Sequence, residues 1–315
     1  MHEHPLTLTS EDDHLIKGTT FTPDRPQAVL VIAHGMAEHN GRYADFARWL
    51  GQHGIAAITF NHRGHGPDCS PKDLGHYSDR DGWHKVTDDL HRVLTHARQQ
   101  FPGIPVILLG HSMGSFIAQS CLQQHGNAAD ALILSATNRI NKPELLAYRT
   151  LIIGLKKVFG KRHQSPILAN LSFGRFNKRF VPARTDADWL SRDPDQVDAY
   201  LADPLCGFNC TNGLWHDLVQ GMLSINPRAW RKDLPVHLFA GTDDPVAEMG
   251  KGVTRHFRTI RNAGVKRVTF RLFNGGRHEM LNETNVEEVR EYILALCQSH
   301  LPKEAPEKQT TAPTA

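Results

Sequence analysis

The sequence predicts an α/β protein: a mostly parallel, doubly wound sheet of about eight strands, with a block of helices inserted before the last strands. Short apolar runs alternate with amphipathic segments in residues 1–135 and again in residues 236–301. The run AVLVIA at 28–33 contains no polar residue, which is typical of a strand buried on both faces of a parallel sheet. Strands that alternate with helices in this order favour parallel pairing.

The same periodicity places the individual elements. Strands are expected twice within 6–21, around a polar turn, and then at 28–33, 55–60, 106–110, 131–134, 236–240 and 267–273. Helices are expected at 43–53, 83–100, 116–124, 249–262 and 286–299, and, in the inserted block, at 143–158, 165–176, 189–201 and 214–225.

The inserted block suggests how the chain is organised. Residues 1–137 and 231–301 are expected to form one core, while 138–230 form a helical cap over the active site. A second independent domain is the alternative interpretation of 138–230. Residues 302–315 are too polar to bury apolar surface and are expected to be a disordered tail.

Composition excludes several classes of function. The 315 residues carry a net charge of +3, and no basic run is interleaved with aromatic residues, so no nucleic-acid partner is expected. No signal-peptide pattern and no apolar run of membrane-spanning length is visible, which favours a cytoplasmic protein. Five scattered cysteines and the lack of an H-E-x-x-H spacing predict no metal site; Cys206 and Cys210 alone are a weak zinc signal. No oligomeric state is indicated.

The segment around Ser112 carries the main functional signal. A predicted strand ends at Gly110, Ser112 follows, and Gly114 leads into a predicted helix. A serine at the tip of a strand-to-helix turn sits on strained backbone, so the residues two positions before and after it must be small. The pattern G-x-S-x-G in this context therefore predicts that Ser112 is a nucleophile.

A serine hydroxyl needs a base, and the base needs an orienting carboxylate. In this kind of fold the acid and the histidine follow the serine, each in a loop after a strand. His278 follows the strand predicted at 267–273 and is the expected base. The loop after the strand predicted at 236–240 offers Asp243 and Asp244, and the residue pattern does not separate them.

An oxyanion formed at Ser112 needs two N–H donors. The backbone N–H of Met113, directly after the nucleophile, is the first predicted donor. The second is the N–H of Met36, which the His34-Gly35 bend presents after the strand at 28–33.

Five sequence blocks together resemble the monoglyceride lipase and lysophospholipase group of α/β-hydrolases. The first of them, H-G-x-x-E-H-x-x-R-Y, is a far rarer pattern than G-x-S-x-G. The blocks are HGMAEHNGRY at 34–43, NHRGHG at 61–66, GHSMG at 110–114, GTDDPV at 241–246 and GRHE at 276–279. The resemblance thus covers both halves of the predicted sheet.

The resemblance implies an α/β-hydrolase fold with hydrolysis of carboxylic esters and no metal or organic cofactor. It assigns the acid to Asp244, through the G-x-x-D pattern, and agrees with Met36 as an oxyanion donor. It also implies that Glu38 and Arg42 bind the glycerol end of a substrate. The alternative is that these two residues form a salt bridge that only shapes their loop.

Three hypotheses of function follow. The first is a serine esterase that cleaves a small acyl ester or single-chain lipid, monoacylglycerol or lysophospholipid, through an acyl-serine intermediate. The second is a serine peptidase or small-ester esterase, because the fold alone does not decide between them. The third is a non-catalytic binding protein, which predicts the loss of a triad member although Ser112, Asp244 and His278 are all present.

The cap contains one segment that mixes apolar and basic residues, LIIGLKKVFGKR at 151–162. Such a segment can rest transiently on an anionic membrane surface. The alternative is a cap helix that packs on the core and exposes its lysines to solvent.

Overall fold

The computed structural model of the chain describes residues 1–302. Within this range eight strands form one sheet in the order β1-β2-β4-β3-β5-β6-β7-β8. β1 and β2 pair antiparallel with each other, β2 pairs antiparallel with β4, and all pairs from β4 to β8 are parallel. The strands are β1 His2–Thr9, β2 Leu15–Thr22, β3 Ala28–Ala33, β4 Ile55–Phe60, β5 Val106–His111, β6 Ala131–Ser135, β7 Val236–Gly241 and β8 Val268–Phe273.

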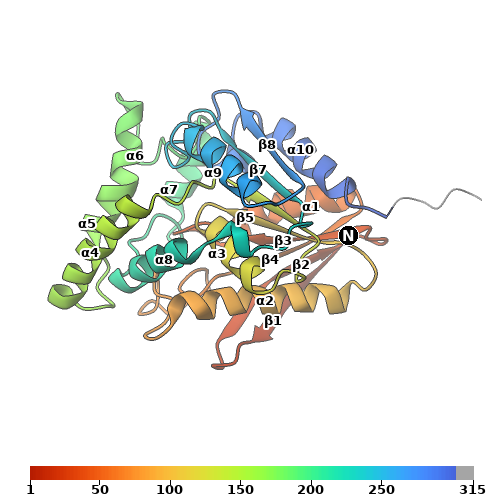
Figure 1. Ribbon diagram of the computed structural model, residues 1–315, viewed down its shortest axis with the longest axis horizontal. Coiled ribbons are helices and arrows are strands. Elements are labelled where there is room, and N and C mark those ends of the chain that lie inside the picture. Colours follow the sequence, from red (N-terminus) through yellow and green to blue (C-terminus); the bar gives the residue numbers. More distant parts are fainter. Residues whose placement is uncertain (303–315) are drawn as a thin grey trace, which may run out of the picture.

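The sheet that the sequence predicts is therefore confirmed, and helices cover both of its faces (Figure 1). The helices of this core are α1 Ala44–Gln52, α2 Gly82–Gln100, α3 Met113–Gln124, α9 Lys251–Asn262 and α10 Val286–Gln298. The predicted tail at 302–315 lies, apart from residue 302, outside the described residues.

Alternate residues of β3 explain why that strand is apolar throughout. Val29 and Val31 pack in a core to which α2, α3 and α9 contribute side chains. Leu30 and Ile32 point to the opposite face, where α1 and α10 form a second core. Because both faces are buried, neither set of positions tolerates polar residues.

Strand register brings the loops of interest together at one edge of the sheet. Ala33 at the end of β3 pairs with Gly110 near the end of β5. Gly241 at the end of β7 pairs with Phe273 at the end of β8. The carboxyl ends of parallel strands share one edge of a sheet, which is where ligands bind in such folds.

The chain between β6 and β7 contains helices, which we call the helical insertion. They stand beside the sheet, in green and teal in Figure 1. They are α4 Lys142–Phe159, α5 Pro166–Ala169, a π-helical turn Asn170–Gly174, α6 Arg175–Asn177, α7 Pro194–Ala202 and α8 Asn212–Ser224. No helix within residues 1–302 has both the length and the apolar character needed to cross a membrane.

Two helix starts differ by more than two residues from those that periodicity predicts. Helix α3 begins at Met113 rather than at 116, because the turn at Ser112 leads directly into the first helical turn. Helix α7 begins at Pro194 rather than at 189, because Asp193 caps it by accepting a hydrogen bond from the N–H of Asp195. Trp189 therefore lies in the loop before α7, where it is buried.

The start of α3 lies against the end of β3 with no space for a side chain. A Cβ atom added to Gly114 would lie 2.1 Å from the carbonyl oxygen of Ala33. Gly154, in the exposed middle of α4, has no heavy atom within 4 Å of the same added Cβ. A side chain should therefore destabilise the fold at Gly114, whereas the structure has space for one at Gly154.

We expect Gly114→Ala to lower the free energy of unfolding by roughly 1–3 kcal/mol or more, because backbone atoms must move apart. Gly154→Ala should raise it by about 0.5–1 kcal/mol, because alanine restricts the unfolded chain and favours a helix. Urea unfolding followed by circular dichroism measures both changes. A neutral Gly114→Ala variant would contradict the close approach of α3 to β3.

Candidate active site

Ser112 sits on strained backbone at the end of β5. Its φ is 50° and its ψ is −118°, which a residue with a side chain rarely adopts. Such a conformation costs about 1–3 kcal/mol and persists only where the surroundings fix it. Here the N–H of Ser112 donates to the carbonyl of Ser135 on β6, at 2.9 Å. The sharp turn that the sequence predicts is therefore present.

The structure brings Ser112, His278 and Asp244 together. The hydroxyl of Ser112 lies 2.9 Å from Nε2 of His278, and Nδ1 of His278 lies 3.0 Å from Oδ1 of Asp244. Asp243, by contrast, accepts a hydrogen bond from the hydroxyl of Thr242 at 3.2 Å. Of the two carboxylates that the sequence left open, Asp244 is the one that faces the histidine.

The surroundings of His278 favour its charged form. Burial lowers the pKa of this imidazole, but the charge of Asp244 and the hydrogen bond to it outweigh burial, so the pKa lies above the usual 6.5. The rings of Trp189 and His111 flank the imidazole, with centroids 5.0 and 4.9 Å away. Oδ1 of Asp244 also accepts the N–H of Val246 at 2.8 Å, which fixes the carboxylate.

The loop after β3 runs directly against Ser112. A Cβ added to Gly35 would lie 3.4 Å from Cβ of Ser112. Met36 and Met113 both line the cavity that contains Ser112, which has a volume of about 570 Å³. The N–H of Met113 belongs to the first turn of α3, where a helix leaves its N–H groups without internal acceptors.

The peptide groups on either side of Ala37 hold this loop in place. Its φ is 54°, and its N–H donates to Nε2 of His65 at 3.2 Å. Burial lowers the pKa of His65 to about 3, so the ring stays neutral and Nε2 can accept. The carbonyl of Ala37 accepts from the N–H of Gly207 at 2.9 Å and from the hydroxyl of Tyr200 at 3.2 Å. Both the core and the helical insertion therefore position the loop.

Glu38 and Arg42 form a buried ion network. Oε1 of Glu38 accepts from the N–H of Gly35 and, at 2.9 Å, from the hydroxyl of Tyr43. The guanidinium of Arg42 donates to Oε2 of Glu38 at 3.0 Å and makes two hydrogen bonds of 2.6 Å to Glu279. These residues line a separate, smaller cavity of about 160 Å³. Neither Glu38 nor Arg42 is among the described residues that line the larger cavity with Ser112.

Glu279 is a member of this network that the sequence did not reveal. Burial raises the pKa of its carboxyl, but the guanidinium of Arg42 outweighs burial and holds the pKa below the usual value. Its position directly after His278 was the available signal. No signal pointed to Trp189 or Tyr200, because an aromatic residue in a loop or short helix is more often a packing residue.

With this geometry established, the chain can be compared with known proteins. Residues 24–285 match the family described as "Serine aminopeptidase, S33". The chain belongs to this family. It is 29% identical over 286 residues to a monoacylglycerol lipase of Mycolicibacterium smegmatis, which covers 89% of this chain and 92% of that one. It is 26% identical over 269 residues to the monoglyceride lipase of Homo sapiens, covering 82% and 77% of the two chains.

A solved structure supports the same relationship. The carboxyl esterase from Bacillus coagulans, in complex with glycerol, superposes with a TM-score of 0.87 at 25% identity, over 95% of this chain and 99% of that one. The likeness confirms the α/β-hydrolase fold that the sequence blocks predict. This member of the S33 family is accordingly a hydrolase.

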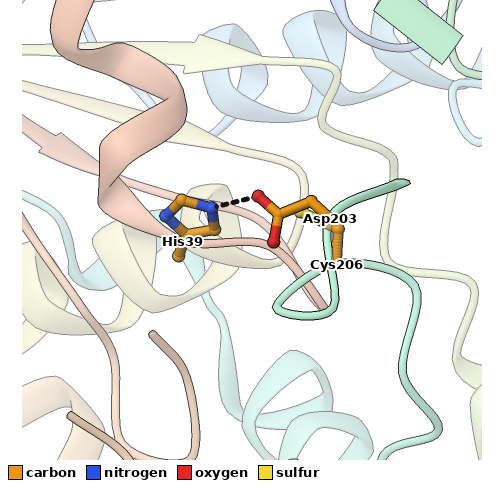
Figure 2. A group of neighbouring side chains, drawn as sticks. All are labelled: His39, Asp203 and Cys206. Carbon is orange, nitrogen blue, oxygen red and sulfur yellow. Dashed lines mark hydrogen bonds and ion pairs between the residues drawn. The ribbon is translucent and has the colours of Figure 1, made fainter. Parts of the chain in front are cut away.

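One cluster beside the loop after β3 brings together three residue types that bind metals: His39, Asp203 and Cys206 (Figure 2). Nδ1 of His39 accepts the N–H of Gly41 at 3.1 Å, so the ring proton lies on Nε2 and is donated to Asp203 at 2.8 Å. A histidine that binds a metal through one nitrogen normally donates a proton from the other. The hydrogen bonding seen here instead makes His39 a link between the loop and the helical insertion.

The contact between Asp244 and His278 predicts a measurable change in titration. In Asp244→Asn the pKa of His278 should fall, because burial remains while the adjacent negative charge is lost. NMR of the imidazole Cε1–H resonance against pH measures it, and Asp243→Asn is the matched control that should titrate as the unmodified protein does. Equal titration in Asp244→Asn would show that another group holds the proton on His278.

Proposed function

We propose that this protein is a serine esterase that hydrolyses carboxylic esters with a single acyl chain, monoacylglycerol or lysophospholipid, through an acyl-serine intermediate. The observation that carries the proposal is the bridge of His278 between Ser112 and Asp244, at 2.9 and 3.0 Å, beside a large cavity. The relatives described as monoacylglycerol and monoglyceride lipases and the carboxyl esterase with bound glycerol support it.

The proposed reaction has two halves, acylation and deacylation of Ser112, and the same groups act in both. Nε2 of His278 accepts the proton of Ser112 while Oγ attacks the ester carbonyl carbon, and the N–H groups of Met36 and Met113 donate to the resulting oxyanion. The imidazolium then protonates the leaving alcohol, which departs and leaves an acyl-serine. Water repeats these steps, so that the carboxylic acid leaves and Ser112 regains its proton.

Each group contributes at a defined moment. The charge of Asp244 stabilises the imidazolium and keeps Nε2 free to accept the serine proton. A single oxyanion donor contributes about 3–4 kcal/mol to the stability of the transition state, so the fixed position of the loop at Met36 is an important part of the proposed mechanism. The strained turn keeps Ser112 exposed to the cavity without any rearrangement during the reaction.

The helical insertion acts in this proposal as the cap, over residues 138–230. It supplies most of the apolar wall of the large cavity, whose volume of about 570 Å³ falls in the usual range for ligand pockets. The apolar lining from the insertion is Leu145, Ile152, Leu168, Leu171, Phe173, Phe176, Trp189, Trp215, Leu218, Val219 and Met222. Such a wall suits an acyl chain.

Part of α4 and the loop after it is suited to transient contact with a lipid surface. Val158 is 73% exposed and Phe159 is 52% exposed, beside Lys157. Lys161 and Arg162, also basic, are instead tied to the core: Lys161 donates to the carbonyl of Asp79, and Arg162 pairs with the carboxylates of Asp73 and Asp79. The surface available for membrane contact is therefore the end of α4 rather than the whole basic segment.

The structure favours esters over peptides with a free α-amino group. An aminopeptidase needs unpaired carboxylates to hold that amine. The acidic residues lining the large cavity, within the described part of the chain, are Glu144 and Glu248, and both have arginine partners. A small-ester esterase remains compatible with the same machinery.

Fluorophosphonate labelling and hydrolysis test the proposal together. The protein should be labelled, and Ser112→Ala should abolish both labelling and hydrolysis of monoacylglycerol. Asp244→Asn should lower kcat roughly 10⁴-fold, because the histidine loses its orienting charge, whereas Asp243→Asn should stay within a few-fold. A protein that is neither labelled nor active on monoacylglycerols, lysophosphatidylcholine, aryl esters or aminoacyl amides would instead be a non-catalytic binding protein.

Glu38 and Arg42 are proposed to shape the loop rather than to bind glycerol, because the Glu38 carboxylate is already satisfied by its neighbours. Glu38→Gln should therefore reduce kcat/KM about tenfold for both a monoacylglycerol and a short aryl ester, as expected for one weakened charged hydrogen bond. Steady-state kinetics on both substrates measures this. A rise in KM confined to the monoacylglycerol would restore the glycerol-binding role.

A further inference from the structure

The large cavity is positively charged. Five of its lining residues are basic and two are acidic, an excess of three positive charges in one pocket. The basic residues are Arg139, Arg175, Arg179, Lys251 and Arg255. The whole chain has a net charge of only +3, so the excess around the cavity is a local concentration and not a property of the whole surface.

The two acidic residues form ion pairs with only some of these cations. Glu248 pairs with Arg139 at 2.7 Å and with Arg255 at 3.0 Å. Glu144 lies 3.7 Å from Arg175, at the edge of ion-pair distance. Within residues 1–302, the side chains of Arg179 and Lys251 make no ion pair and no hydrogen bond. Arg179 and Lys251 are exposed residues, so two hydrated cations line the cavity without a partner among the described residues.

These cations come from both sides of the cavity. Arg139 follows β6, the neighbour of the strand that ends at Ser112, and Lys251 begins α9 on the chain that leaves Asp244. Arg179 belongs to the helical insertion, directly after α6. Lys251 and Arg255, on α9, thus come from the core, whereas Arg139, Arg175 and Arg179 belong to the insertion, which also supplies most of the apolar wall. An acyl chain and an anionic head group would each find a matching surface.

We propose that the preferred substrate is an acyl ester whose alcohol part carries an anionic group, such as a phosphate. Arginine and lysine are the usual partners of phosphate oxygens in proteins, and a ligand anion would supply the missing partners of Arg179 and Lys251. This inference rests on the proposed esterase function and narrows it, since a neutral monoacylglycerol offers these two cations no anionic partner.

Short-chain esters test the cavity itself, because they dissolve as monomers and remove any contribution from an anionic membrane surface. The matched pair is 1-butyrylglycerol and 1-butyrylglycerol 3-phosphate, which differ only in the phosphate. We expect kcat/KM to be at least about tenfold higher for the phosphorylated ester, mainly through KM. Added salt should reduce this preference, because it screens the attraction.

The double variant Arg179→Gln/Lys251→Gln should abolish most of the preference. Lys178→Gln/Arg258→Gln is the matched control: it removes the same charge from the neighbour of Arg179 and from α9, at residues that do not line the cavity, and should keep the preference. Circular dichroism and thermal unfolding check that both variants are folded, and the comparison uses the ratio of the two kcat/KM values.

Equal kcat/KM for the two esters in the unmodified protein would overturn this inference while leaving the esterase proposal standing. A preference that survives in Arg179→Gln/Lys251→Gln, or one lost equally in the control variant, would also overturn it. If neither ester is hydrolysed and a fluorophosphonate fails to label Ser112, the proposed function itself fails, and this inference fails with it.

Discussion

The arrangement of the candidate site depends on the close approach of the start of α3 to the end of β3. Because Gly114 has no side chain, its backbone can lie against the carbonyl of Ala33, where a Cβ would be 2.1 Å away. This approach lets the loop after β3 reach the nucleophile turn, so that Gly35 lies against Ser112. A backbone contact thus sets the distance between Ser112 and the loop that carries Met36, before any side-chain chemistry is considered.

The pairing of charged side chains differs between the two cavities. Around the smaller cavity the single guanidinium of Arg42 is bound by two carboxylates, those of Glu38 and Glu279, so this cation has protein partners. Breaking one member of a buried pair is costly, which suits a structural role. Around the larger cavity the cations outnumber the carboxylates. Incomplete pairing at a surface that also contains the nucleophile suits a ligand that brings its own charge.

The sequence predicted the sheet, and it singled out Ser112 and His278, because strand burial and the position of a residue after a strand follow local rules. Buried strands such as β3 are apolar on both faces, and the elbow around Ser112 has a fixed spacing. The choice between Asp243 and Asp244 needed the resemblance, since adjacent residues differ only in direction. Contacts such as Tyr200 to Ala37 join segments 163 residues apart, and no local pattern encodes them. The role of Glu279 was hidden for the same reason.

The links between the helical insertion and the core limit how the cavity can open. Glu279 donates its N–H to the carbonyl of Leu190 at 2.8 Å, and Tyr200 and Gly207 both donate to Ala37. If this part of the insertion moved away, the loop beside Ser112 would lose two of its three restraints on Ala37. Any opening of the cavity that keeps this loop in place would therefore have to leave residues 190–207 in place as well.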